Sequence, residues 1–182
     1  MKLRDYELFI FDFDGTLNMP SILVRLNGFF KKRYKIEYIL SHKELFQKKK
    51  IEYRNEKRLE KEEAIYNAFY DIYSIIFKPQ IKPGAQELLK ELKRMKKKIA
   101  LFSDGKEYRV RRELAMMGLE EYFELILAAD SIKIFKPNPA PLELIVSSLK
   151  IPKLRSIYIG DMAVDVMAAK FAGISSCSVM DG

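Results

Sequence analysis

Two aspartates separated by a single residue stand directly after an apolar run near the start of the chain. The run is residues 8–11 (LFIF), and the acids are Asp12 and Asp14 of the segment DFDGT. Like charges this close raise each other's pKa unless a cation or a proton neutralises one of them. Such a pair is suited to hold a divalent metal while one carboxylate attacks an electrophile and the other moves a proton. The sequence therefore indicates nucleophilic chemistry at the end of a strand.

Three later segments also place polar residues just after apolar runs or in a proline turn. They are residues 98–105 (KIALFSDG), 135–139 (FKPNP) and 157–165 (IYIGDMAVD). With DFDGT they resemble, in order, the four motifs of the haloacid dehalogenase-like hydrolase superfamily. The resemblance extends to its phosphatase branch with a small helical cap, as in phosphoglycolate phosphatases. All four motifs in the family's order make a chance match improbable.

The resemblance implies a role for each motif residue in breaking a phosphate ester. Asp12 is the expected nucleophile, which forms an aspartyl-phosphate, and Asp14 is the expected acid and base. Ser103 is expected to bind a phosphoryl oxygen, and Lys136 to neutralise the nucleophile and the transferring group. The backbone N–H groups of Asp104 and Gly105 are expected to assist Ser103.

The same resemblance implies a Mg²⁺ site, because Mg²⁺ prefers hard oxygen ligands and few carboxylates. Its expected ligands are Asp12, the backbone carbonyl of Asp14, and Asp161. Asp165 is either a further ligand or a residue that orients the ligands. Asp161 could also cap the helix that follows it.

Alternating strand-like and helix-like patterns from Gly84 onward predict the fold class. It is an α/β fold, a Rossmann-like open parallel sheet with helices on both faces. The predicted strands are residues 99–102, 125–128, 156–159 and 176–179, and the predicted helices include 110–117, 141–149 and 163–172. The motifs then fall at the carboxyl ends of strands, where open α/β sheets bind ligands.

Residues 17–82 lack this pattern and show only helical periodicity, including a helix over about 55–77. We therefore predict an α/β hydrolase core over residues 1–16 and 83–182, and a small all-helical cap over 17–82 inserted after the first strand. The resemblance implies that the cap closes over the site and excludes water.

The insertion is strongly basic: residues 17–82 hold 15 Lys and Arg against 8 Asp and Glu. These charges fit solvated helix faces, a surface that steers anionic substrates, or a nucleic-acid-binding surface. Nucleic-acid binding alone leaves the four acidic motifs unexplained, so we do not expect a nucleic-acid partner.

The composition is that of a globular protein, with 48% apolar and 32% charged residues in 182. The single cysteine fits a reducing compartment, and no apolar run approaches the roughly 20 residues of a membrane span. The N-terminus does not read as a signal peptide. We expect a cytoplasmic monomer or homodimer with no membrane partner.

Together these features predict a Mg²⁺-dependent phosphatase of small phosphorylated metabolites. The alternative within the same fold is a phosphomutase, which passes the phosphoryl group to a second hydroxyl instead of to water. The sequence leaves the substrate open among phosphoglycolate, nucleoside monophosphates, sugar phosphates and pyrophosphate.

Overall fold

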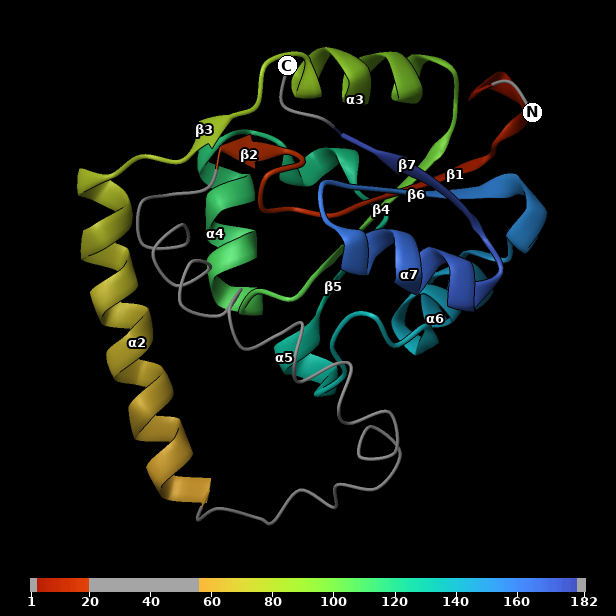
Figure 1. The fold of residues 1–182 in the computed structure, drawn as a ribbon. Coiled ribbons are helices and arrows are strands. Elements are labelled where there is room, and N and C mark those ends of the chain that lie inside the picture. Colours follow the sequence, from red (N-terminus) through yellow and green to blue (C-terminus); the bar gives the residue numbers. More distant parts are fainter. Residues whose placement is uncertain (1–2, 20–55, 180–182) are drawn as a thin grey trace. The chain divides into compact units, whose positions relative to one another are not determined.

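The computed structural model describes residues 3–19 and 56–179 (Figure 1). The chain divides into two compact units. The first, which we call the core unit, comprises residues 1–19 and 78–182, and it contains every candidate site residue. The second comprises residues 20–77, and its described part is helix α2 (Glu56–Ile76) with the following Phe77.

The core unit is built on one five-stranded sheet in which every pair of neighbours is parallel. Its strands are β1 (Leu8–Phe11), β4 (Lys98–Ser103), β5 (Leu125–Ala128), β6 (Ser156–Gly160) and β7 (Ser175–Ser178), in the order β5-β4-β1-β6-β7. In the register, Phe11 at the end of β1 lies opposite Leu101 of β4 and Ile159 of β6. The carboxyl ends of these three strands therefore meet at one edge of the sheet.

Successive side chains of β1 enter two separate hydrophobic cores, because a strand presents alternate residues to opposite faces. Phe9 and Phe11 pack in one core with residues of α3 (Ala85–Arg94) and α4 (Glu107–Met116). Leu8 and Ile10 pack in the other with residues of α6 (Ala140–Leu149) and α7 (Ala163–Ala172). Figure 1 shows α3 and α7 on opposite sides of the sheet.

The predicted fold class is confirmed. The helix over 163–172 and the strand over 125–128 have their predicted bounds, and the other core elements differ from prediction by a few residues. The shorter elements of the described chain are α5 (Ala129–Ile132) and the 3-10 turns Leu3–Asp5, Glu120–Tyr122 and Lys153–Arg155.

The expectation of purely helical structure over 17–82 needs a correction. Strands β2 (Asn18–Met19) and β3 (Gln80–Ile81) pair antiparallel near the two ends of this segment, and both belong to the core unit. Two-residue strands carry too little alternation to be seen in a sequence. The predicted helices within residues 20–55 lie outside the described residues.

No helix in the described ranges is both long enough and apolar enough to cross a membrane.

Neighbouring leucines of α3 offer a matched test of the core. Leu89 is fully buried, whereas Leu88 is 41% exposed. We expect Leu89→Ala to lower the free energy of unfolding by about 2–5 kcal/mol, because it leaves a cavity. Leu88→Ala should lower the free energy of unfolding by well under half of that amount, because the side chain is already partly exposed. Denaturant unfolding of both variants measures the difference, and equal losses would contradict this packing.

Candidate active site

The candidate residues converge at the carboxyl edge of the sheet. Asp12 directly follows β1, Ser103 is the last residue of β4, and Asp161 directly follows β6. The backbone continues the sheet for one more residue, because the N–H of Asp12 donates to the carbonyl of Ile159 at 2.8 Å. Parallel pairing thus brings together three residues that are far apart in the sequence.

Asp12 and Lys136 form a buried ion pair at the centre of the site. Their side chains are 8% and 4% exposed, and Nζ of Lys136 contacts Oδ1 of Asp12. Nζ also lies 2.8 Å from Oδ1 of Asp165. Burial raises the pKa of Asp12 from 3.8 to about 7, against the lowering effect of Lys136. Burial alone would lower the pKa of Lys136, but the surrounding acidic groups, Asp12 foremost, raise it well above its ordinary value.

The backbone of Lys136 is held by the loop after β4. Its N–H donates to Oδ1 of Asp104 at 3.0 Å. In the same loop the N–H of Gly105 donates to Oγ of the buried Ser103 at 3.0 Å. Ser103, Asp104 and Gly105 therefore form a hydrogen-bonded turn next to Lys136, in which the Gly105 N–H is bonded to Ser103.

Three carboxylates of this edge are close enough to share a metal ion. Ligand oxygens of Asp12, Asp161 and Asp165 all lie within 4.8 Å of one another. Burial raises the pKa of Asp161, and the negative charge of Asp165 raises it further. A cation bound there would stabilise the charged form of Asp161. The donor set is entirely hard oxygen, which suits a divalent cation of the Mg²⁺ type. The side chain of Asp14 is not part of this cluster.

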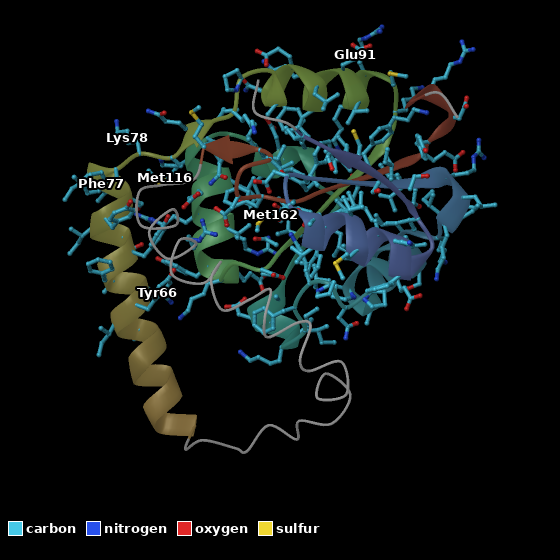
Figure 2. All side chains as sticks on the ribbon, viewed as in Figure 1. Tyr66, Phe77, Lys78, Glu91, Met116 and Met162 are labelled. Atoms are coloured by element: carbon cyan, nitrogen blue, oxygen red, sulfur yellow. The ribbon has the colours of Figure 1, made fainter. Side chains whose placement is uncertain are left out.

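Asp165 differs from the other two acids because both of its oxygens already accept hydrogen bonds. Oδ1 lies 3.2 Å from the Tyr158 hydroxyl as well as 2.8 Å from Lys136. Oδ2 accepts from the N–H of Met162 at 2.9 Å. Met162, labelled in Figure 2, is the N-cap of α7, so the possible capping role of Asp161 is wrong. These bonds fit a residue that orients the site.

Asp14 pairs with Arg109, which the sequence did not single out. The two groups form a bidentate ion pair, with Nη1 at 2.9 Å from Oδ1 and Nη2 in contact with Oδ2. Glu113 lies behind Arg109, with Oε1 at 3.2 Å from Nη1. A signal was present in the sequence: Arg109 and Glu113 stand one helical turn apart beside the apolar Val110 and Leu114. Charged side chains beside the apolar stripe of a helix can face the protein interior, but the sequence does not show which residue they would pair with there.

Glycines give the acidic side chains their space. Gly15 has φ +84°, and a Cβ built on it would overlap the Asp161 carboxylate. A Cβ on Gly160 would overlap the Asp165 carboxylate. The turn after β1 is also held by Lys82, whose Nζ donates to the Gly15 carbonyl at 2.7 Å.

The raised pKa of Asp12 predicts a pH dependence of stability in EDTA. Between about pH 4 and 7 the folded chain keeps a proton on Asp12 that the unfolded chain has lost, so the stabilisation is present at low pH and disappears as the pH rises through 7. We expect the free energy of unfolding of the unmodified protein, relative to Asp12→Asn, to fall by up to about 1.4 kcal/mol per pH unit over this range. Urea unfolding of both proteins measures it. A constant difference from pH 4 to 8 would show that Asp12 is not perturbed.

Gly15→Ala should weaken metal binding. The substitution forces a side chain into the left-handed region and against Asp161. Gly84 is the matched control, because its φ is +81° and its added Cβ would meet nothing within 4 Å. Both variants should lose about 1–2 kcal/mol of stability from the backbone conformation. Only Gly15→Ala should reduce the affinity for a divalent cation, by at least roughly tenfold, in isothermal titration calorimetry. Equal affinity in both variants would contradict the placement of Asp161.

Comparison with known proteins gives the same family as the motifs. The family model described as haloacid dehalogenase-like hydrolase matches residues 9–179. A phosphoglycolate phosphatase of Colwellia psychrerythraea is 27% identical over 203 residues, covering 100% of this chain and 88% of the relative. The plasmid-encoded phosphoglycolate phosphatase of Cupriavidus necator is 36% identical over 100 residues, but these cover only 55% of this chain and 43% of the relative.

A solved structure agrees with the fold. CbbY from Rhodobacter sphaeroides, crystallised in complex with phosphate, has a TM-score of 0.69 at 21% identity, covering 94% of this chain and 84% of that one. At this identity the likeness supports the fold alone. The family model spans all four motifs and nearly the whole chain, and the chain therefore belongs to the haloacid dehalogenase-like hydrolase family.

Proposed function

We propose that the chain is a Mg²⁺-dependent phosphatase that acts on small phosphorylated metabolites. The observation that carries the proposal is the buried Asp12 carboxylate, paired with Lys136 and sharing a possible cation site with Asp161 and Asp165. Burial next to a fixed cation gives a carboxylate that is held in place and shielded from water. Family membership and the phosphoglycolate phosphatase relatives support the same activity.

In the first step an oxygen of Asp12 attacks phosphorus and the bond to the leaving oxygen breaks. Asp14, which pairs with Arg109 as a carboxylate in the structure and must take up a proton before this step, gives that proton to the leaving oxygen, so an alcohol departs and an aspartyl-phosphate remains. Lys136 stabilises the charge on the phosphoryl oxygens from a position fixed by Asp165 and by its backbone bond to Asp104. We expect the Ser103 hydroxyl, at the end of β4, to donate a hydrogen bond to one of them.

In the second step water attacks the phosphorus of the aspartyl-phosphate. Asp14, now ionised, takes a proton from the water, and the bond between phosphorus and Asp12 breaks. Inorganic phosphate leaves, Asp12 is again a carboxylate, and Asp14 is again protonated. The cycle thus returns both acids to their starting states without a further reactant.

Mg²⁺ would be held by Asp12, Asp161 and the carbonyl of Asp14, with Asp165 as the orienting residue. When bound, the ion supplies positive charge that offsets the repulsion between the carboxylates and the substrate phosphate. Asp161 is the exposed member of the acidic cluster, so a hydrated ion could approach from its side.

Phosphoglycolate is the first substrate to test, because the relatives named above carry that activity in their names. The other small phosphate esters considered from the sequence belong in the same screen, ranked by kcat/KM. We further propose that residues 17–82 form the substrate-selecting cap, and that its two ends, which carry the β2–β3 pair, belong to the core unit.

Asp12→Asn should abolish phosphate release while the protein stays folded. The amide keeps the shape of the side chain but cannot act as the nucleophile, so turnover should fall by at least about 10³-fold. Glu91→Gln, on the exposed side of α3 and labelled in Figure 2, removes a carboxylate remote from the site and should leave turnover unchanged. EDTA should abolish phosphate release by the unmodified protein, and added Mg²⁺ should restore it.

Near-normal turnover by Asp12→Asn in the presence of Mg²⁺ would refute the mechanism. The phosphomutase alternative is tested by following free phosphate and sugar-phosphate isomers together. Formation of an isomer without release of phosphate would overturn the hydrolase assignment.

A further inference from the structure

The strongest feature outside the motif residues is the pairing of Arg109 with Asp14. The two residues are 95 positions apart, in α4 and in the turn after β1, and both belong to the core unit. The guanidinium binds both carboxylate oxygens, with Nη1 at 2.9 Å from Oδ1 and Nη2 in contact with Oδ2. A planar fork of this kind fixes the plane of a carboxylate as well as its position.

Neighbouring residues hold Arg109 in place. Nη1 lies 3.2 Å from Oε1 of Glu113, and Oε2 of Glu113 accepts from Nδ2 of Asn18 at 2.8 Å. Cζ of Arg109 lies 5.6 Å from the centre of the Phe13 ring, a cation–π distance. The missing side chain of Gly105 gives the guanidinium room, since a Cβ there would stand 2.5 Å from Nη2.

Stability alone does not account for this cluster. The side chains of Arg109 and Glu113 are 7% and 3% exposed, so both charges have been removed from water. Buried ion pairs are often no more stable than apolar side chains of the same size. Asp14 is the exception in the cluster, with 24% of its side chain exposed. The buried charges of Arg109 and Glu113 therefore hold in place the Asp14 carboxylate, which is still partly exposed.

We propose that Arg109 is a positioning residue that fixes the orientation of the Asp14 carboxyl group, which in its protonated form transfers a proton to the leaving oxygen. Glu113 and Asn18 set the position of Arg109, and the open side of Asp14 is left to the substrate. The role rests on the proposed phosphatase function, and it assigns to α4 a part in the reaction that none of the four motifs contains.

The test compares two kinds of ester. A p-nitrophenolate leaves without help from an acid, whereas an alkoxide needs a proton, so faulty acid catalysis harms only the alkyl ester. We would measure kcat/KM for p-nitrophenyl phosphate and for an alkyl phosphate ester chosen from the metabolite screen. Arg109→Lys keeps one positive charge but cannot form the fork. Its loss of kcat/KM should be at least about tenfold larger for the alkyl ester, which is part of the roughly 10²–10⁴-fold that a general acid contributes.

Two controls separate positioning from damage to the fold. Arg111→Lys changes an exposed arginine of the same helix, which pairs with Glu107 and Glu120 at the surface, and should leave both rates unchanged. In an Asp14→Asn background, Arg109→Lys should lower kcat/KM for the alkyl ester by less than about a further threefold, because the carboxyl group that Arg109 orients is already lost. If Arg109→Lys does not fold, Arg109→Gln with Glu113→Gln removes both buried charges together and takes its place.

Equal losses for the two esters would overturn the positioning role, and so would an undiminished effect of Arg109→Lys in the Asp14→Asn background. Either result would leave the phosphatase function standing, since the unmodified protein would still hydrolyse both esters. Failure of the unmodified protein to hydrolyse either ester would instead overturn the phosphatase function, and this role of Arg109 with it.

Discussion

The site depends on the burial of Lys136 between two carboxylates. A lysine whose side chain is only 4% exposed is tolerated only if anions surround its ammonium group, and Asp12 and Asp165 supply them. The rings of Phe102 and Tyr158, each 5.5 Å from Nζ, complete its surroundings. The same burial raises the pKa of Asp12 to about 7 although Lys136 acts to lower it, so a cation bound beside Asp12 would favour the charged form that the proposed mechanism requires.

The two acids of the first motif therefore have different surroundings despite their spacing. Asp12 is buried and paired with a lysine, whose single charge leaves carboxylate oxygens available to a metal and a phosphorus atom. Asp14 is partly exposed and paired with an arginine, whose fork engages both oxygens. Distinct environments for neighbouring carboxyl groups are the usual way in which one site holds an acid–base group beside a nucleophile.

The backbone accommodates this concentration of charge through a few local features. Gly15 and Gly160 leave room for the carboxylates of Asp161 and Asp165, and Lys82 fixes the turn that carries Gly15. Asp165 binds the N–H of Met162, so the start of α7 and the position of Lys136 are set by the same side chain. A change in any of these residues would move several charged groups at once.

The parallel α/β fold, the strand ends that carry the motifs, and helix bounds such as those of α7 could be predicted from the sequence. These follow from local periodicity and from motif order, both of which are readable along the chain. The three-dimensional structure was needed to show that Arg109 binds Asp14 across 95 residues, that both oxygens of Asp165 accept hydrogen bonds, and that β2 pairs with β3. The physical reason is that a charged residue beside an apolar stripe looks the same in sequence whether it faces water or a buried partner. The identity of that partner depends on which distant strand end the sheet brings alongside it.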